Sequence, residues 1–371
     1  MAGDPERKAA KRRSQVAKGL DRAYGATAPE RVEIDALDLL IVSDHHRGAR
    51  DGADDFRRCE RSYNAALAHF LETGHGLLLL GDTEELWECD PEDVIAAYPR
   101  TYALEAEFAA RGRYRRVWGN HDDEWRHARS VERHREALGG DRADVREAFR
   151  LEITRDGEPL GELFFVHGHQ GTDDAERWSW ISRIVVRKIW RPLQRKLRIA
   201  STSPASDWDL REMHDEAMFA WARRAPTRPV VIAGHTHRPV FGVGRRAPVV
   251  PEPLEQLERR YQELRRAGAP AEELCAARTR LEYLYAELRR YDRPAIPVVP
   301  PCYFNTGCCS FGDGDVTALE ITGGRIRLLR WLDDEQQPAG KVLAEASLEE
   351  VLGAVGAGAD VRIGEAAGVP A

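Results

Sequence analysis

Histidine, aspartate and asparagine gather in five short clusters of the sequence: "SDHH" (43–46), "GDTEE" (81–85), "GNHDD" (119–123), "VHGH" (166–169) and "GHTH" (234–237). Turns favour Gly, Asn and Asp, but they have no reason to select histidine at four of five places. Imidazole and carboxylate together suit first-row transition metal ions, whereas the absence of cysteine from all five clusters argues against a structural zinc site. The pattern therefore predicts a metal site built from several loops.

Each cluster follows an apolar run that can position it as the end of a strand. The runs "LDLLIV" (37–42), "GLLLL" (76–80) and "YRRVW" (114–118) alternate with helix-like segments, which predicts an α/β sheet buried on both faces. After residue 150 the pattern changes to hairpins that turn at Asp156-Gly157 and at Gly323-Gly324. We expect two sheets packed together with helices outside, and the polar clusters at the carboxyl ends of strands, where such sheets bind ligands.

The five clusters, in this order, resemble the motifs D-x-H, G-D, G-N-H-[DE], H and G-H-x-H of the calcineurin-like metallophosphoesterase superfamily. The match runs from residue 44 to residue 237, and "FNTG" (304–307) is similar to a strand-turn near the end of that fold. The resemblance implies an α/β fold, a four-layer α/β/β/α sandwich, and hydrolysis of a phosphoester by a hydroxide held between two divalent transition metal ions. Mn²⁺ is the favoured metal, with Fe, Zn or Co as alternatives that the same ligands accept.

The resemblance also implies which side chains bind each metal ion. Asp44, His46 and His237 would bind one ion, Asn120, His167 and His235 the other, and Asp82 would bridge the two. In an extended strand end residues i and i+2 point the same way, so His45 is expected to face away from the ion that Asp44 and His46 share. His169 is expected to lie in the outer shell of the site or at the surface.

The catalytic residues expected beside the metals are His121 and Glu85. His121 lies next to Asn120 in "GNHD" and would bind the phosphoryl group or protonate the leaving oxygen. The resemblance places a carboxylate three residues after Asp82, at Glu85, to orient this histidine. Glu84 and Asp122 are alternatives for that role.

Substrate class is left open by the motifs. "GHTHRP" and "GDTEELWE" resemble the bacterial UDP-2,3-diacylglucosamine pyrophosphatases, and the basic, apolar stretch 178–200 suits peripheral contact with an anionic membrane. His121 departs from that group, which typically has arginine there, and is the general pattern shared with nucleases and cyclic-nucleotide phosphodiesterases. A phosphorylated substrate is expected in each case, nucleic acid remains an alternative partner, a non-catalytic scaffold is the least favoured reading, and the oligomeric state is unknown.

Composition and charge indicate where the 371-residue protein is located in the cell, and the pattern along the chain indicates how its domains are arranged. A net charge of −7, the lack of an 18-residue apolar run and the lack of an apolar segment behind the basic N-terminus predict a cytoplasmic protein, with peripheral membrane attachment as the alternative. We expect a flexible N-terminal arm (1–32), one metallophosphoesterase domain (33–335) and a flexible C-terminal tail (336–371). Two helical insertions, 173–224 and 252–291, are predicted to interrupt the domain.

Overall fold

The computed structural model describes residues 5–51, 54–140, 143–171, 208–242, 260–261, 264–270, 273–280, 301–310, 314–332, 338–357 and 364–365. The chain divides into two compact units. Met1–Val243 together with Val299–Ala371 form the larger unit, and Gly244–Val298 form the smaller one.

An eight-stranded sheet carries the first three polar clusters. Its strand order is β14-β13-β12-β11-β2-β3-β4-β5. The parallel half consists of β2 (Leu39–Val42), β3 (Gly76–Leu80), β4 (Tyr114–Val117) and β5 (Asp144–Arg146). The antiparallel half consists of β11 (Val316–Thr322), β12 (Arg325–Leu332), β13 (Ala339–Ser347) and β14 (Gly364–Glu365). Because β2, β3 and β4 are parallel, the clusters that follow them lie at one edge of the sheet.

A six-stranded sheet carries the other two clusters, with the order β1-β6-β7-β8-β10-β9. Its strands are β1 (Pro29–Glu33), β6 (Ala148–Arg155), β7 (Glu158–Val166), β8 (Val230–Ala233), β9 (Pro239–Phe241) and β10 (Tyr303–Thr306). Strands β7 and β8 are parallel, so their carboxyl ends, where "VHGH" and "GHTH" begin, also meet at one edge.

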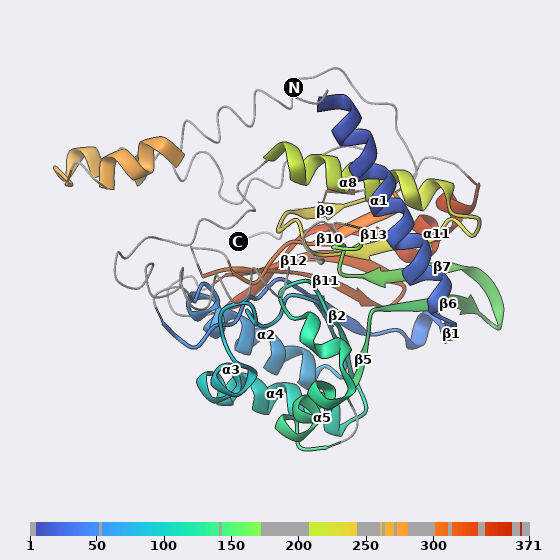
Figure 1. The fold of residues 1–371 in the computed structure, drawn as a ribbon, viewed down its shortest axis with the longest axis horizontal. Coiled ribbons are helices and arrows are strands. Elements are labelled where there is room, and N and C mark those ends of the chain that lie inside the picture. Colours follow the sequence, from blue (N-terminus) through green and yellow to red (C-terminus); the bar gives the residue numbers. More distant parts are fainter. Residues whose placement is uncertain are drawn as a thin grey trace. The chain divides into compact units, whose positions relative to one another are not determined.

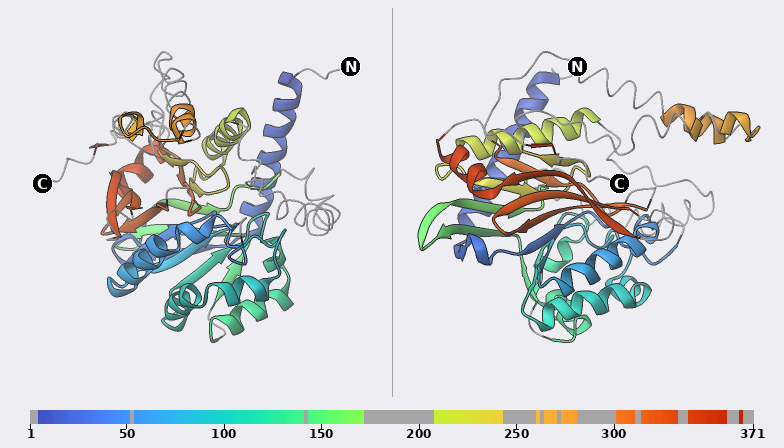
Figure 2. Two further views of the ribbon diagram at one scale, coloured as in Figure 1. Left: turned by 90° about the vertical axis from the view of Figure 1, so that its left-hand side faces the viewer. Right: turned by 180° about the vertical axis from the view of Figure 1, so that it is seen from behind.

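Helices flank the two sheets of the larger unit, as expected for the four-layer sandwich (Figure 1; a second pair of views is in Figure 2). On one side lie α2 (Glu60–Glu72), α3 (Pro91–Ala97), α4 (Pro99–Ala110) and α5 (Ala128–Ala137). On the other lie α1 (Pro5–Ala26) and α8 (Trp208–Arg224), while α11 (Leu348–Ala357) packs against strands of both sheets. Short 3₁₀ helices occur at Ile34–Ala36, Phe56–Arg58 and Asp123–Arg126.

The predicted strands and hairpins are confirmed, but each of the two sheets also contains strands from the other half of the sequence. The hairpin β6–β7 turns at Asp156 and Gly157, both with positive φ, and β11–β12 turns at Gly323 and Gly324. Strands β11 to β14, from the end of the chain, extend the sheet of the first half. Strand β1, from the beginning, pairs in parallel with β6 in the other sheet. Pairing between distant segments leaves no local pattern in the sequence, so hydrophobic periodicity cannot predict it.

The N-terminal segment differs from the predicted flexible arm. Helix α1 buries Val16, Leu20 and Ala23, and the Trp221 indole N–H on α8 donates to Asp21 at 2.7 Å. The Tyr24 ring, at the end of α1, contacts Trp221 edge-on with centroids 5.6 Å apart. The apolar stripe of α1 is short and lies among many charged residues. Composition alone therefore favours a flexible arm over a helix that packs on the domain.

The C-terminal segment differs from the predicted tail in the same way. Strand β13 pairs along the whole of β12, and α11 buries Leu348, Val351, Leu352 and Val355. These four residues follow the i, i+3, i+4 spacing of an amphipathic helix, so a local signal was present among the Ala and Gly residues.

The two predicted insertions are described only in part. Helix α8 is the last part of the 173–224 insertion. The residues before it, including the basic stretch 178–200, lie outside the described residues. In the smaller unit, residues 260–261, 264–266 and 273–280 are helical around a turn at 267–268, and Leu264 and Leu274 are half-buried. None of the described helices is long and apolar enough to cross a membrane.

Candidate metal centre

Nearly all of the predicted ligands are drawn together by loops at strand ends. Their backbone is unusual: of the eight non-glycine residues with positive φ in the described part of the chain, five are Asp44, His46, Asp82, His235 and His237. Left-handed backbone at such residues costs about 1–3 kcal/mol each and persists only where the surroundings hold it, typically at functional sites. The strain therefore marks these loops independently of any motif.

The orientation of His45 agrees with the prediction, although the premise behind it was wrong. Asp44 and His46 have φ of 54° and 50°, so the backbone is left-handed there and not extended. The His45 ring is nonetheless directed away from the site and packs edge-on against Phe56 and Tyr63, with centroids 5.6 and 4.7 Å apart. Strand alternation is thus not the cause; the two left-handed residues turn His45 into the core.

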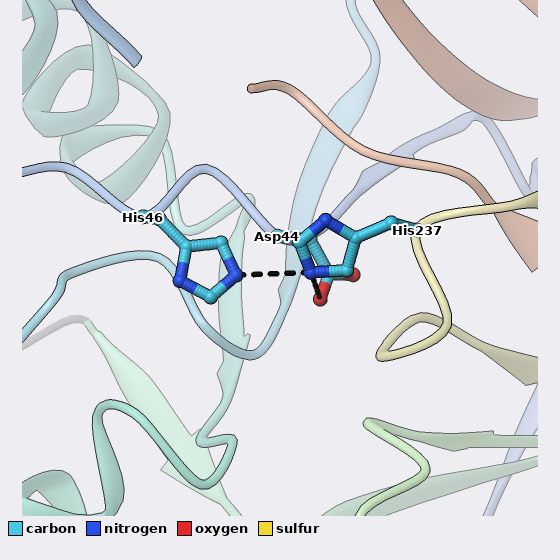
Figure 3. Close-up of side chains that lie close together, drawn as sticks. All are labelled: Asp44, His46 and His237. Carbon is cyan, nitrogen blue, oxygen red and sulfur yellow. Dashed lines mark hydrogen bonds and ion pairs between the residues drawn. The ribbon is translucent and has the colours of Figure 1, made fainter. Parts of the chain in front are cut away.

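Three side chains converge from the first and fifth clusters (Figure 3). The Nε2 atom of His237 lies 3.1 Å from Nε2 of His46 and 3.3 Å from Oδ1 of Asp44. Nδ1 of His46 faces Glu85 Oε2 at 3.0 Å and must donate to it, so in neutral His46 the Nε2 atom carries a lone pair directed at the other two groups. Two imidazoles and a buried carboxylate oxygen at this spacing fit a first-row metal ion.

A second convergence is centred on Asp82. Nδ1 of His167 donates to the Leu80 carbonyl at 2.8 Å, so Nε2 of neutral His167 is an acceptor, and it faces Asp82 Oδ2 at 3.1 Å. An orienting bond of this kind to the other ring nitrogen is typical of metal-binding histidines. Asn120 Oδ1 is buried with no hydrogen-bond partner among the described residues. A nitrogen and a carboxylate oxygen at the distance between His167 and Asp82 need a cation between them. Without a metal that cation is a proton, since Asp82 outweighs burial and raises the pKa of His167 to about 9, and a metal ion can take its place.

A third group of side chains links the two convergences. Side chains that could hold a metal ion form three groups in the described part of the chain: Asp44, His46 and His237; His46, Asp82 and His121; Asp82, His167 and His235. Asp82 belongs to two of these groups and His46 to two. A chain of overlapping groups is the arrangement expected when neighbouring ions share a bridging carboxylate.

Glycine precedes the site residue in three of the motifs, and at all three the space that a Cβ atom would take is already occupied; at Gly81 that atom would lie 2.5 Å from the ring of His167. A Cβ atom at Gly119 would lie 2.1 Å from Asp82 Oδ1, and one at Gly234 would lie 2.5 Å from Asp44 Oδ2. Real Cβ atoms never approach so closely. These glycines therefore allow one loop to pass directly beside a side chain held by another.

His121 and Glu85 form the predicted pair. Nδ1 of His121 donates to Glu85 Oε2 at 2.7 Å, and the indole of Trp87 stacks on the imidazole with centroids 4.0 Å apart. Burial alone would lower the pKa of His121, but the carboxylates of Glu85 and Asp82 outweigh it and raise the pKa to about 10. The structure thus favours a protonated His121 at neutral pH.

The alternatives to Glu85 have other partners. Glu84 accepts from the Trp125 indole at 2.9 Å and from Arg116, whereas Asp122 accepts from the backbone N–H groups of Asp82, Thr83 and Gly119 at 2.6–3.2 Å. Asp122 therefore ties the second cluster to the third and does not orient His121. The expectation that Glu84 or Asp122 could substitute for Glu85 was wrong.

A buried ionic network under the site was not predicted. Arg116 and Arg47 are both fully buried and pair with Glu84, Asp122 and Glu105. One signal was available in the sequence: "YRRVW" places two arginines in a strand that the α/β pattern buries on both faces, so one of them must find carboxylates inside.

His169 is buried, with its ring 5.5 Å from that of His167 and 5.3 Å from that of Trp118, centroid to centroid. It is in none of the three ligand groups. The surface position that was one of the two expectations for His169 is therefore wrong, and the outer-shell position agrees with the structure.

The fold and these ligand groups define the class of a metal-binding α/β sandwich with its site at the carboxyl ends of strands. A family model described as calcineurin-like phosphoesterase matches residues 37–239, more than half of the chain, and the chain belongs to this family. Solved structures similar to it include Vacuolar Protein Sorting 29 from Cryptosporidium parvum, with 12% identity and a TM-score of 0.31, covering 84% of this chain and 98% of that one. A conserved uncharacterized protein from Streptococcus pneumoniae, described as a predicted phosphoesterase, has 10% identity and a TM-score of 0.30, covering 82% and 97%. No curated protein matches the chain.

Proposed function

We propose that this protein is a phosphoester hydrolase that depends on two divalent transition metal ions. The observation that carries the proposal is the overlap of the three ligand groups through His46 and Asp82, because a single isolated ion has no need of it. Two bound cations would supply Lewis acidity, lowering the pKa of a water molecule and neutralising charge on the phosphoryl group.

The ligand assignment follows the two convergences. Asp44, His46 and His237 would hold one ion. Asn120, His167 and His235 would hold the other, and Asp82 would contribute to both. The nitrogen and oxygen ligands suit Mn²⁺, and they also accept Fe, Zn or Co.

His121 and Glu85 would handle the proton that the leaving group needs. Glu85 Oε2 holds the proton on His121 Nδ1, which keeps the ring in one orientation and favours the imidazolium. The remaining nitrogen, Nε2, is then the atom that can give a proton to the departing oxygen or bind a phosphoryl oxygen. Stacking on Trp87 limits rotation of the ring, so the proton donor is already oriented before substrate binds.

The proposal is tested by hydrolysis of bis-p-nitrophenyl phosphate and p-nitrophenyl phosphate with added Mn²⁺, with Asp82→Ala as the control and bound metal measured in both proteins. We expect two metal ions per chain and hydrolysis of at least one ester in the wild type, and loss of both in the variant. Two bound metals without activity on either ester would refute the proposed hydrolysis while leaving the metal site in place. A wild-type protein that binds no metal would refute the proposal.

A further inference from the structure

Helix α8 places a carboxylate against the back of the Gly-His-Thr-His turn. Asp215 Oδ1 accepts a hydrogen bond from the Thr236 hydroxyl at 3.2 Å and another from the Tyr303 hydroxyl at 2.8 Å. Asp215 Oδ2 pairs with the guanidinium of Arg238. The side chain is buried, so these three partners replace most of the water that would otherwise solvate its charge.

The turn that Asp215 contacts has a strained backbone, which must be stabilised by residues outside the turn. His235 and His237 both have left-handed backbone, with φ of 69° and 55°, and Thr236 lies between them. Asn305 supports the same turn, since its side-chain N–H group donates to the Gly234 carbonyl at 2.6 Å and to Thr236 Oγ1 at 3.2 Å. Asp215 and Asn305 thus fix the turn from two elements, α8 and β10.

Helix α8 is itself held in place, which makes it a suitable support. The Trp221 indole N–H donates to Asp21 of α1 at 2.7 Å, and the Tyr24 ring of α1 contacts the Trp221 ring edge-on with centroids 5.6 Å apart. The imidazole of His214, also on α8, lies edge-on to that of His235 with centroids 5.0 Å apart. Two consecutive residues of this helix therefore face the histidine turn.

We propose that Asp215 is a positioning residue of the metal centre, one that sets the direction of His235 and His237 through Thr236 and Arg238. The inference rests on the proposed function, because it assigns those two histidines to metal ions. If Asp215 has this role, helix α8 contributes to the geometry of the metal centre. This helix lies in the insertion between the fourth and fifth motifs.

The test measures Co²⁺ binding to the full chain by calorimetry and by visible absorption, which reports ligand geometry. Asp215→Ala is expected to bind Co²⁺ about 10–100-fold more weakly, the usual effect of removing an outer-shell partner, and to show an altered spectrum. Asp215→Asn keeps an acceptor for Thr236 and Tyr303 but loses the charge that holds Arg238, so its loss should be smaller. Glu216→Gln, on the same helix but in an exposed ion pair with Arg13, is the matched control and should bind as the wild type does.

Wild-type Co²⁺ affinity and spectrum in Asp215→Ala, together with a lowered melting temperature, would show a merely structural role and overturn the inference. If Asp215→Ala does not fold, Asp215→Asn decides by the same comparison. Ester hydrolysis by the wild type separates the two proposals. A wild type that binds Co²⁺ but hydrolyses neither ester refutes the proposed function, while the affinity comparison still tests Asp215. A wild type that binds no Co²⁺ overturns both.

Discussion

The carboxylate of Glu84 is buried beside the loops of the candidate metal centre, and its removal should lower the free energy of unfolding of the protein. The carboxylate accepts from Arg116, Trp125 and Tyr102. Burial alone would raise the pKa of Glu84, but Arg116 outweighs it and lowers the pKa from 4.5 to about 2. We consider Glu84→Gln, which keeps the shape of the side chain and removes its charge.

The magnitude follows from the proton affinity. At about 1.4 kcal/mol for each tenfold difference, the lowered pKa corresponds to about 3 kcal/mol of stability carried by the ionised carboxylate. Breaking one partner of a buried ion pair costs about 3–5 kcal/mol, which agrees. Because the pKa is lowered on folding, this contribution is complete above pH 4.5 and is lost as the pH falls from 4.5 towards 2.

The assay is urea unfolding at pH 7, followed by circular dichroism. The matched control is Glu107→Gln on α4, where Glu107 pairs with Arg111 at 3.5 Å on the exposed face and its removal should cost less than about 0.5 kcal/mol. A loss below about 1 kcal/mol for Glu84→Gln, or one equal to that of the control, would refute the reasoning that the buried network stabilises the fold.

Three further outcomes are expected. His121→Gln should lower kcat by about 10²–10⁴-fold while metal content by elemental analysis stays that of the wild type, and metal loss equal to that of Asp82→Asn would contradict the separate roles. Gly119→Ala should weaken Mn²⁺ binding in a titration, because its methyl group would meet Asp82 Oδ1, whereas Gly140→Ala, where nothing lies within 4 Å, should leave binding unchanged. Burial, followed by Arg116, lowers the pKa of His134 to about 3, so its contribution to stability is complete above pH 6.5 and is lost as the pH falls. Between pH 7 and 5.5 the free energy of unfolding in urea should therefore fall by about 1 kcal/mol less in His134→Phe than in the wild type, and equal declines would refute this.

The sequence predicts the strands and the site well because both have local signatures. Four consecutive leucines between Gly76 and Gly81 make a run that is too short for a helix and is typical of a buried strand, and each motif that follows a strand must lie at its end. Residues that act through tertiary contacts have no such signature. Asp215 meets Thr236 because a helix passes behind a turn, and Arg116 meets Glu84 because two strands are neighbours in a sheet. The separation of the two residues along the sequence is not regular in either pair, so neither pair could be found from hydrophobic periodicity or from a motif.

The left-handed backbone of the site residues was also beyond prediction from the chain alone. Aspartate and histidine adopt positive φ more often than most residues, but which of them do so in a given chain is decided by their surroundings. The surroundings of Asp44 and Asp82 come from loops that are far apart in sequence, as the hydrogen bond from the His235 backbone N–H to Asp44 Oδ2 shows.

The docking of α1 has a consequence for synthesis on the ribosome. Asp21 and its partner Trp221 are 200 residues apart, which is roughly 10–40 s of translation at about 5–20 residues per second. Strand β1 likewise has no partner until β6 emerges. The first 33 residues therefore leave the exit tunnel long before the partners of their long-range contacts are synthesised. Their high charge and sparse apolar residues, the features that make them resemble an arm, keep the nascent segment from aggregating during that delay.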